Sequence, residues 1–138
     1  MAFRMSIDLK NELSNRVTQL MAGTIGTGGT ASLTIRVGTQ PTDIESEGTG
    51  GTLCVISNIG WGSSTAGTAS FATAGGYLGT AVTSGTAGWA RLECINDYGT
   101  CRIDGDIGTA AGNVFTINVN NFSSGGVFTL AAADIYTV

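Results

Sequence analysis

Residues 86–108 read TAGWARLECINDYGTCRIDGDIG, and this stretch predicts one long β-hairpin with a single register. If residues 96–99 form a four-residue loop, a common length for a hairpin connection, Cys94 lies opposite Cys101. The same register brings together two opposite-charge pairs and one apolar pair: Glu93 with Arg102, Arg91 with Asp104, and Leu92 with Ile103. Each such pair contributes roughly 0.2–1 kcal/mol, and a slip would place Glu93 opposite Asp104. We therefore expect the hairpin to have a well-specified register.

The composition predicts a single β-rich domain. Only 12% of the 138 residues are charged, about half of the usual share, while 42% are hydrophobic, with 22 Gly and one Pro. This apolar content argues against disorder. The net charge is −4, and the basic residues form no stripe, which argues against a nucleic-acid partner. They are scattered along the chain: Arg4, Lys10, Arg16, Arg36, Arg91 and Arg102.

Apolar runs in the chain are short. No signal-type apolar segment follows the first residues, and no run approaches the length of a transmembrane helix. We therefore expect synthesis in the cytoplasm and no membrane partner. Three Cys is an odd number and implies no disulfide framework.

The N-terminus predicts an arm followed by one amphipathic helix. Residues 1–5 form a short arm, in which Phe3 and Met5 are available to dock on another surface. Ser6 is a suitable N-cap, and a helix is expected over residues 6–22. Its apolar stripe consists of Leu9, Leu13, Val17, Leu20 and Met21. Two interpretations stay open: the stripe covers one end of the protein's own sheet, or it packs on a neighbouring subunit.

After a Gly/Thr linker at residues 23–31, residues 32–138 have the pattern of a β-domain. Short alternating or apolar segments recur with turn residues between them, which predicts seven to nine strands. The fold class is expected to be an antiparallel β-sandwich, similar to a jelly roll. The expected strands are residues 32–37, 52–57, 68–73, 77–82, 87–95, 100–107, 114–119 and one or two within 127–138. The most acidic loop, residues 38–51, carries Asp43, Glu45 and Glu47.

The residue types argue against catalysis. The chain has no His, so it lacks the most common general base and metal ligand, and a Ser-His-Asp site is impossible within one chain. Each Cys lies in an apolar strand, which favours buried, unreactive thiols, although a cross-strand disulfide between Cys94 and Cys101 stays open. Asp104 and Asp106 lack the downstream Glu of a calcium loop. We expect no enzyme activity, no cofactor and no metal.

Several aromatic residues are candidates for sugar stacking. Trp61, Trp89 and Tyr98 lie near Gly residues, as exposed or turn-adjacent aromatics do. In a small β-domain such residues more often fill the core. Both interpretations are retained.

A series of short motifs resembles a known group of proteins. They are GTQP at residues 38–41, GTL at 51–53, ASFATAGG at 69–76, GTAGWAR at 85–91, DYGT at 97–100 and IDG at 103–105. The chain resembles small Gly/Ala/Thr-rich structural proteins of tailed bacteriophages and prophages over most of residues 6–130. The resemblance implies a virion component and brings no catalytic residue with it. The three Cys and the charged hairpin pairs depart from the pattern of that group.

The residues and the resemblance together predict a non-enzymatic virion protein, in the first place a capsid decoration or cement protein. Its partner would be the major capsid protein or another virion protein, and it would be a homo-oligomer located in the virion after synthesis in the host cytoplasm. The expected contact residues are Phe3, Met5, Leu9, Leu13, Asp43, Glu45 and Glu47. The alternative is a tail or head-fibre component that binds carbohydrate at Trp61, Trp89 and Tyr98.

Overall fold

A computed structural model describes most of the chain, namely residues 4–21, 31–61, 65–66, 68–69, 76–96, 99–133 and 135–136. These residues form one helix and eleven strands, several of them only two residues long. In chain order the elements are α1 (Ile7–Met21), β1 (Ala31–Arg36), β2 (Thr52–Ile59), β3 (Thr68–Ala69), β4 (Tyr77–Thr80), β5 (Gly85–Thr86), β6 (Trp89–Asn96), β7 (Gly99–Gly108), β8 (Phe115–Ile117), β9 (Asn121–Phe122), β10 (Val127–Ala133) and β11 (Ile135–Tyr136).

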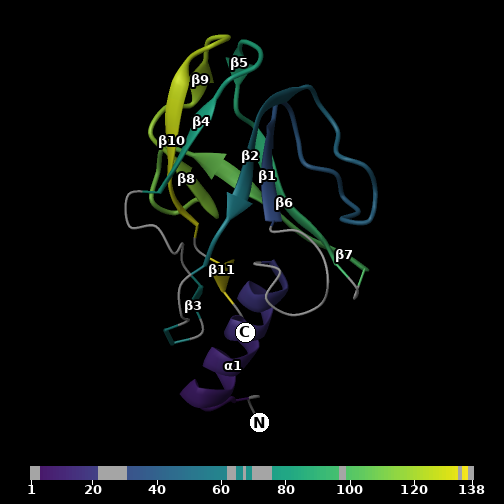
Figure 1. Cartoon of the computed structure of the whole chain (residues 1–138), viewed down its shortest axis with the longest axis vertical. Helices are drawn as coiled ribbons and strands as arrows, with labels where there is room; N and C mark the ends of the chain where they lie inside the picture. Colours follow the sequence, from purple (N-terminus) through teal and green to yellow (C-terminus); the bar gives the residue numbers. More distant parts are fainter. Residues whose placement is uncertain are drawn as a thin grey trace.

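Seven strands form one strongly curved sheet. Their order is β2-β1-β6-β7-β8-β10-β4, and the two outer strands, β2 and β4, lie beside each other, so the sheet is nearly closed (Figure 1). A backbone hydrogen bond of 2.8 Å from the Val82 N–H to the Leu53 carbonyl links the chain just after β4 to β2. The short strands pair separately, β3 with β11 and β5 with β9.

The mainly β class with one helix is confirmed, but the sheet is mixed. All neighbouring strands in the seven-stranded sheet are antiparallel except β7 and β8, which run parallel. The expectation of an antiparallel sheet is therefore wrong at this position. A jelly roll with two facing sheets is not confirmed, because the seven strands are hydrogen-bonded into one sheet.

The central hairpin has the expected register. β6 and β7 pair Cys94 with Cys101, and the two opposite-charge pairs and the Leu92–Ile103 pair are also present. The ladder extends one pair further than expected, to Asn96 and Gly99. Residues 97–98, which complete the predicted loop, lie outside the described residues. Local cross-strand pairing was sufficient to predict this part of the fold.

The core lies inside the curved sheet because side chains of a strand alternate between its two faces. In β1, Leu33 and Ile35 point inward and are fully buried, while Ser32, Thr34 and Arg36 point outward. Inward side chains from the other strands complete one cluster. Its largest fully buried members, besides those of β1, are Leu53, Ile59, Leu92, Phe115, Ile117, Phe128 and Leu130.

The helix lies at one end of the sheet. Its first turn is capped as expected, since Ser6 Oγ accepts a hydrogen bond of 3.3 Å from the Leu9 N–H. Its C-terminal half packs beside β3 and β6, and Met21 is buried in the core cluster. The N-terminal turns point away from the strands (Figure 1). This placement leaves much of the helix surface uncovered.

Several sequence expectations fall on residues that the structure does not describe. Among them are the first three residues, residues 22–30 with all but the last residue of the expected linker 23–31, and most of the expected strand 68–73; Ala31 itself begins β1. The short pair β5–β9 was not predicted, because Gly85 and Thr86 precede Trp89 without a strand-like pattern of their own. Its position depends on contacts between segments far apart in the chain.

We expect Gly88→Ala to destabilise the fold. A Cβ at Gly88 would overlap the backbone carbonyl oxygen of Gly38, and backbone atoms cannot move aside cheaply. The free energy of unfolding, measured by urea titration, should fall by about 1–3 kcal/mol. Gly112→Ala is the matched control, because a Cβ there meets no atom within 4 Å. Equal stability of the two variants would contradict the close approach at Gly88.

Candidate functional site

The most exposed apolar surface of the helix consists of three large side chains. Ile7 is 63% exposed, Leu9 49% and Leu13 41%. Leu9 and Leu13 belong to the apolar stripe predicted from the sequence. Of its other members, Val17 and Leu20 are half-buried and Met21 is buried. Of the two arm residues expected to make contacts, Met5 is half-buried and Phe3 lies outside the described residues.

The helix is rotated so that a different face packs on the protein. Its buried residues are Ser14, Thr18 and Met21, with exposures of 0%, 6% and 3%. The Thr18 hydroxyl is satisfied by donating a hydrogen bond of 2.9 Å to the Asn15 carbonyl. Two small polar side chains and Met21 thus make the buried face of the helix, and Leu9 and Leu13 are exposed. The interpretation that the stripe covers the protein's own sheet therefore does not apply to its N-terminal half, Leu9 and Leu13.

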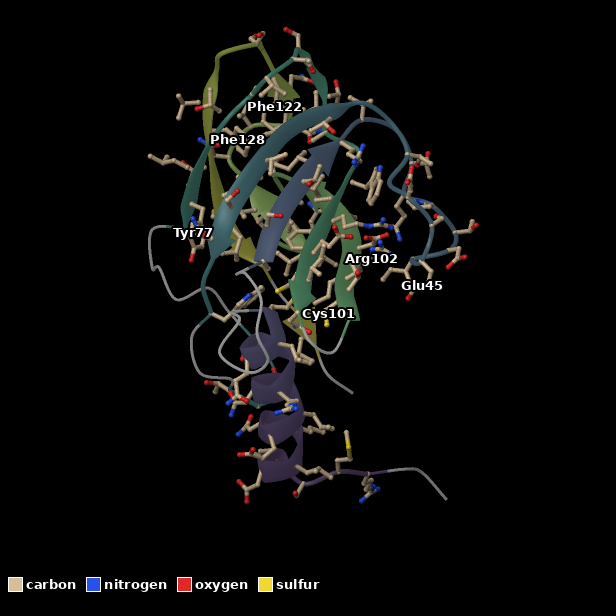
Figure 2. The ribbon with its side chains drawn as sticks, turned by 45° about the vertical axis from the view of Figure 1, so that its right-hand side comes forward. Glu45, Tyr77, Cys101, Arg102, Phe122 and Phe128 are labelled. Carbon is tan, nitrogen blue, oxygen red and sulfur yellow. The ribbon has the colours of Figure 1, made fainter. Side chains whose placement is uncertain are left out.

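The second expected contact element, loop 38–51, is held against the outer face of the sheet by three arginines. We call Arg36 of β1, Arg91 of β6 and Arg102 of β7 the arginine clamp. Each donates to at least one backbone carbonyl of the loop, and Figure 2 labels Arg102 at this contact. The hydrogen bonds run from Arg91 to Ser46 (2.7 Å) and Ile44 (3.2 Å), from Arg102 to Glu45 (3.1 Å) and from Arg36 to Gly50 (3.0 Å).

One ion pair at the centre of the clamp is buried. Arg91 contacts Asp104 through two hydrogen bonds of 2.7 Å, and the two side chains are only 7% and 5% exposed. The side-chain hydrogen bond to Asp104 raises the pKa of Arg91, so its charge is retained. Arg102 pairs with Glu93 at 2.6 Å in a more exposed position. Arg91 therefore has its charge and most of its donors occupied.

The three acidic residues of the loop have different surroundings. Asp43 accepts a hydrogen bond of 2.9 Å from the Glu45 N–H, which stabilises a local turn. Glu45 is exposed and lies 3.3 Å from Arg102, and Figure 2 shows both at the point where the loop crosses the sheet. Glu47 is exposed and is in no ion pair among the described residues. The loop thus offers a folded acidic surface.

A polar cleft lies between this loop and the sheet. Its volume is about 310 Å³, and nearly all of its lining side chains are polar, among them Ser32, Thr34, Arg36, Glu47 and Glu93. Arg36 uses only Nη1 in a hydrogen bond to the loop, and its buried Nε has no hydrogen-bond partner among the described residues. The lining of the cleft thus combines hydrogen-bond donors and acceptors, while Arg36 Nε itself is buried.

The aromatic residues considered for sugar stacking do not form a common exposed face. Trp89 is 1% exposed, its Nε1 donates to the Thr49 carbonyl at 3.2 Å, and the Arg91 guanidinium lies 5.4 Å from the ring centroid. Its ring is therefore not accessible to a sugar. Trp61 is half-buried against the core, and Tyr98 lies outside the described residues.

Among the described residues, no group of three or more His, Cys, Asp or Glu side chains is placed to hold a metal ion. The described part of the chain contains no helix with the length and apolar character needed to cross a membrane.

Comparisons of the chain with protein-family models, with curated proteins and with solved structures returned no match.

The arginine clamp was not predicted from the sequence. Opposite-charge pairs between Arg91 and Asp104 and between Arg102 and Glu93 were expected, but their hydrogen bonds to the loop were not. The only sequence signal is that Arg36, Arg91 and Arg102 all occupy outward positions of strands, next to a Gly-rich loop. Every residue has a backbone carbonyl, so hydrogen bonds from arginine to backbone carbonyls require no particular residue type in the loop and cannot be predicted from its sequence.

Removing the buried arginine should be costly. Arg91→Met leaves Asp104 buried without its counter-charge and also releases the loop, so the free energy of unfolding should fall by about 3–5 kcal/mol. The matched variant Arg102→Met, at a more exposed pair, should cost only about 1 kcal/mol. Urea unfolding at neutral pH measures both.

A double variant distinguishes the stability lost through an unpaired buried charge from the stability lost through poorer packing. Arg91→Met combined with Asp104→Leu removes both buried charges and should recover more than half of the lost stability. A double variant less stable than Arg91→Met alone would contradict this explanation of the ion pair.

Proposed function

We propose that this protein is a non-enzymatic structural component of a tailed-bacteriophage particle, a capsid decoration or cement protein that docks through α1. The observation that carries the proposal is the exposed apolar surface of the helix at Ile7, Leu9 and Leu13. The sequence resemblance to small Gly/Ala/Thr-rich virion proteins supports the part of the proposal that places the protein in a phage particle. The partner would be the major capsid protein or another virion protein.

The physical argument starts from the marginal stability of short helices. A helix of 15 residues is marginal in water on its own, and most helical stability comes from packing of an apolar face. Here the N-terminal turns project beyond the sheet and leave Leu9 and Leu13 exposed. Burying one such side chain contributes roughly 1.5–3 kcal/mol. A groove on a partner that covers both leucines would stabilise the helix and the complex together.

Loop 38–51 would supply a second, polar contact. Because the arginine clamp holds its backbone in place, the loop would lose little conformational freedom on binding. Glu47 and Glu45 are exposed and could meet basic residues of the partner. Modest affinity per copy would be sufficient, since many copies of a homo-oligomer on one shell multiply it.

We expect Leu9→Asp combined with Leu13→Asp to abolish particle binding while leaving the fold intact. Both side chains are exposed, so the substitutions should change the free energy of unfolding by less than about 1 kcal/mol. Binding would be measured by co-sedimentation with shells assembled from the major capsid protein encoded in the same genome. Occupancy should fall at least tenfold, because a charge in an apolar contact costs more than about 1.4 kcal/mol.

Leu78→Asp is the matched control. Leu78 is 73% exposed on β4, away from the helix, and its substitution should leave occupancy unchanged. If the double helix variant decorates shells like the unaltered protein, α1 is not the docking element. If shells bind none of the proteins, the cement role itself is contradicted.

The alternative, a tail or head-fibre component that binds carbohydrate, is favoured by the polar cleft beside loop 38–51. Its hydroxyl, carboxylate and guanidinium groups match the donors and acceptors of a sugar. If this role applies, glycan-array binding should be lost in Arg36→Ala and retained in Lys10→Ala, which lies on the helix. Absence of any glycan binding by the unaltered protein would contradict it.

A further inference from the structure

Cys94 and Cys101 are placed directly opposite each other on neighbouring strands. They are Cα partners in the antiparallel ladder of β6 and β7, so both side chains lie on the same face of the sheet. Opposed residues of such a ladder have Cα atoms about 4.5–5.5 Å apart, whichever type of pair they form. This range falls within the roughly 4.4–6.8 Å that a disulfide spans. The backbone therefore needs no large movement to join the two sulfurs.

The surroundings of the two thiols differ in a way that suits stepwise oxidation. Both cysteines are thiols in this structure. Cys94 is 2% exposed, whereas Cys101 is half-buried and lies at the end of the sheet nearest the helix (Figure 2). An external reagent can therefore reach Cys101 first.

We propose that Cys94 and Cys101 form an intramolecular disulfide on exposure to a low-molecular-weight disulfide such as oxidised glutathione, a covalent cross-link across the central hairpin. Cys54 takes no part, because it lies buried on β2, opposite Ile35 of β1.

The reaction balances in two exchange steps. The Cys101 thiolate attacks one sulfur of glutathione disulfide, the S–S bond of the reagent breaks, and one glutathione thiolate leaves. The Cys94 thiolate then attacks Sγ of Cys101 in the mixed disulfide and releases the second glutathione thiolate. The two protein thiols lose two protons and two electrons, and the two electrons reduce the reagent to two thiols.

The cross-link would lie where the hairpin holds the helix. Asn96, two residues after Cys94, donates from Nδ2 to the Leu20 carbonyl near the end of α1 at 3.2 Å, and its Nδ2 lies 3.8 Å from Cys101 Sγ. Oxidation would tie together the strand ends that make this contact. The hairpin end beneath the helix would become more rigid, because the cross-link restricts the unfolded and partly opened chain.

The second step should be the slow one and should depend on pH. Burial raises the pKa of the Cys94 thiol, and this effect persists after Cys101 has reacted. Only a small fraction of Cys94 is thiolate near neutral pH. The rate of disulfide formation should therefore increase about tenfold per pH unit between pH 7 and 8.

The test is incubation of the full chain with oxidised glutathione, followed by intact-mass measurement, thiol titration and peptide mapping. The monomer should lose two hydrogen atoms, retain one titratable thiol of the three, and yield a peptide in which Cys94 and Cys101 are linked. The melting temperature of the oxidised protein should be higher by about 5 °C and return to its starting value with a reductant.

Single substitutions provide the controls. Cys54→Ser should still form the disulfide and then show no titratable thiol. Cys94→Ser and Cys101→Ser should form none, and Cys101→Ser should also fail to form the mixed disulfide at the hairpin. Because peptide mapping uses the unaltered chain, the result does not depend on how these variants fold.

Three results would overturn the proposal. These are a monomer that keeps all three thiols after prolonged oxidation at pH 8, a mapped link that involves Cys54, and a stable glutathione adduct at Cys101 that never resolves.

Discussion

The buried ion pair between Arg91 and Asp104 connects two parts of the molecule that are far apart in the sequence. It joins β6 to β7 across the central hairpin, and Arg91 also donates to the Ser46 and Ile44 carbonyls of loop 38–51. A buried charge is tolerated only when its partner and remaining donors are satisfied. The loop therefore has to lie against this face of the sheet, and the orientation of its acidic side chains follows from that constraint.

The same constraint makes loop 38–51 and the N-terminal turns of α1 two different kinds of surface. Loop 38–51 is fixed by hydrogen bonds to its backbone, so its side chains are presented in one arrangement. The N-terminal turns of α1 project beyond the sheet, and Leu9 and Leu13 are exposed there (Figure 1). A rigid acidic loop and a projecting apolar helix suit different kinds of contact. In the proposed docking role, the helix would supply most of the binding free energy and the loop the specificity of orientation.

Sequence patterns predicted the elements better than their assembly. The register of the hairpin followed from charge and apolar pairs between adjacent strands, and the helix began at its Ser6 cap as expected. The parallel pairing of β7 with β8 was missed, because residues 109–114 between them have the composition of an ordinary turn region. Trp89 was weighed as an exposed aromatic residue because of its Gly neighbour. The structure buries it beneath the loop, a contact of residues 40 positions apart.

The sequence by itself determined the β-rich class, the limits of the helix and the register of the hairpin, since each depends on residues close together in the chain or on one pair of strands. Only the tertiary structure decided which face of the helix is buried. The apolar stripe alone left open whether Leu9 and Leu13 cover the protein's own sheet or face a neighbour. In the structure both are exposed, and Ser14, Thr18 and Met21 are the buried residues of the helix. The near closure of the sheet and the arginine clamp were likewise decided by packing between distant segments. Periodicity shows that a face is apolar, but the position of the neighbouring elements decides whether that face is covered.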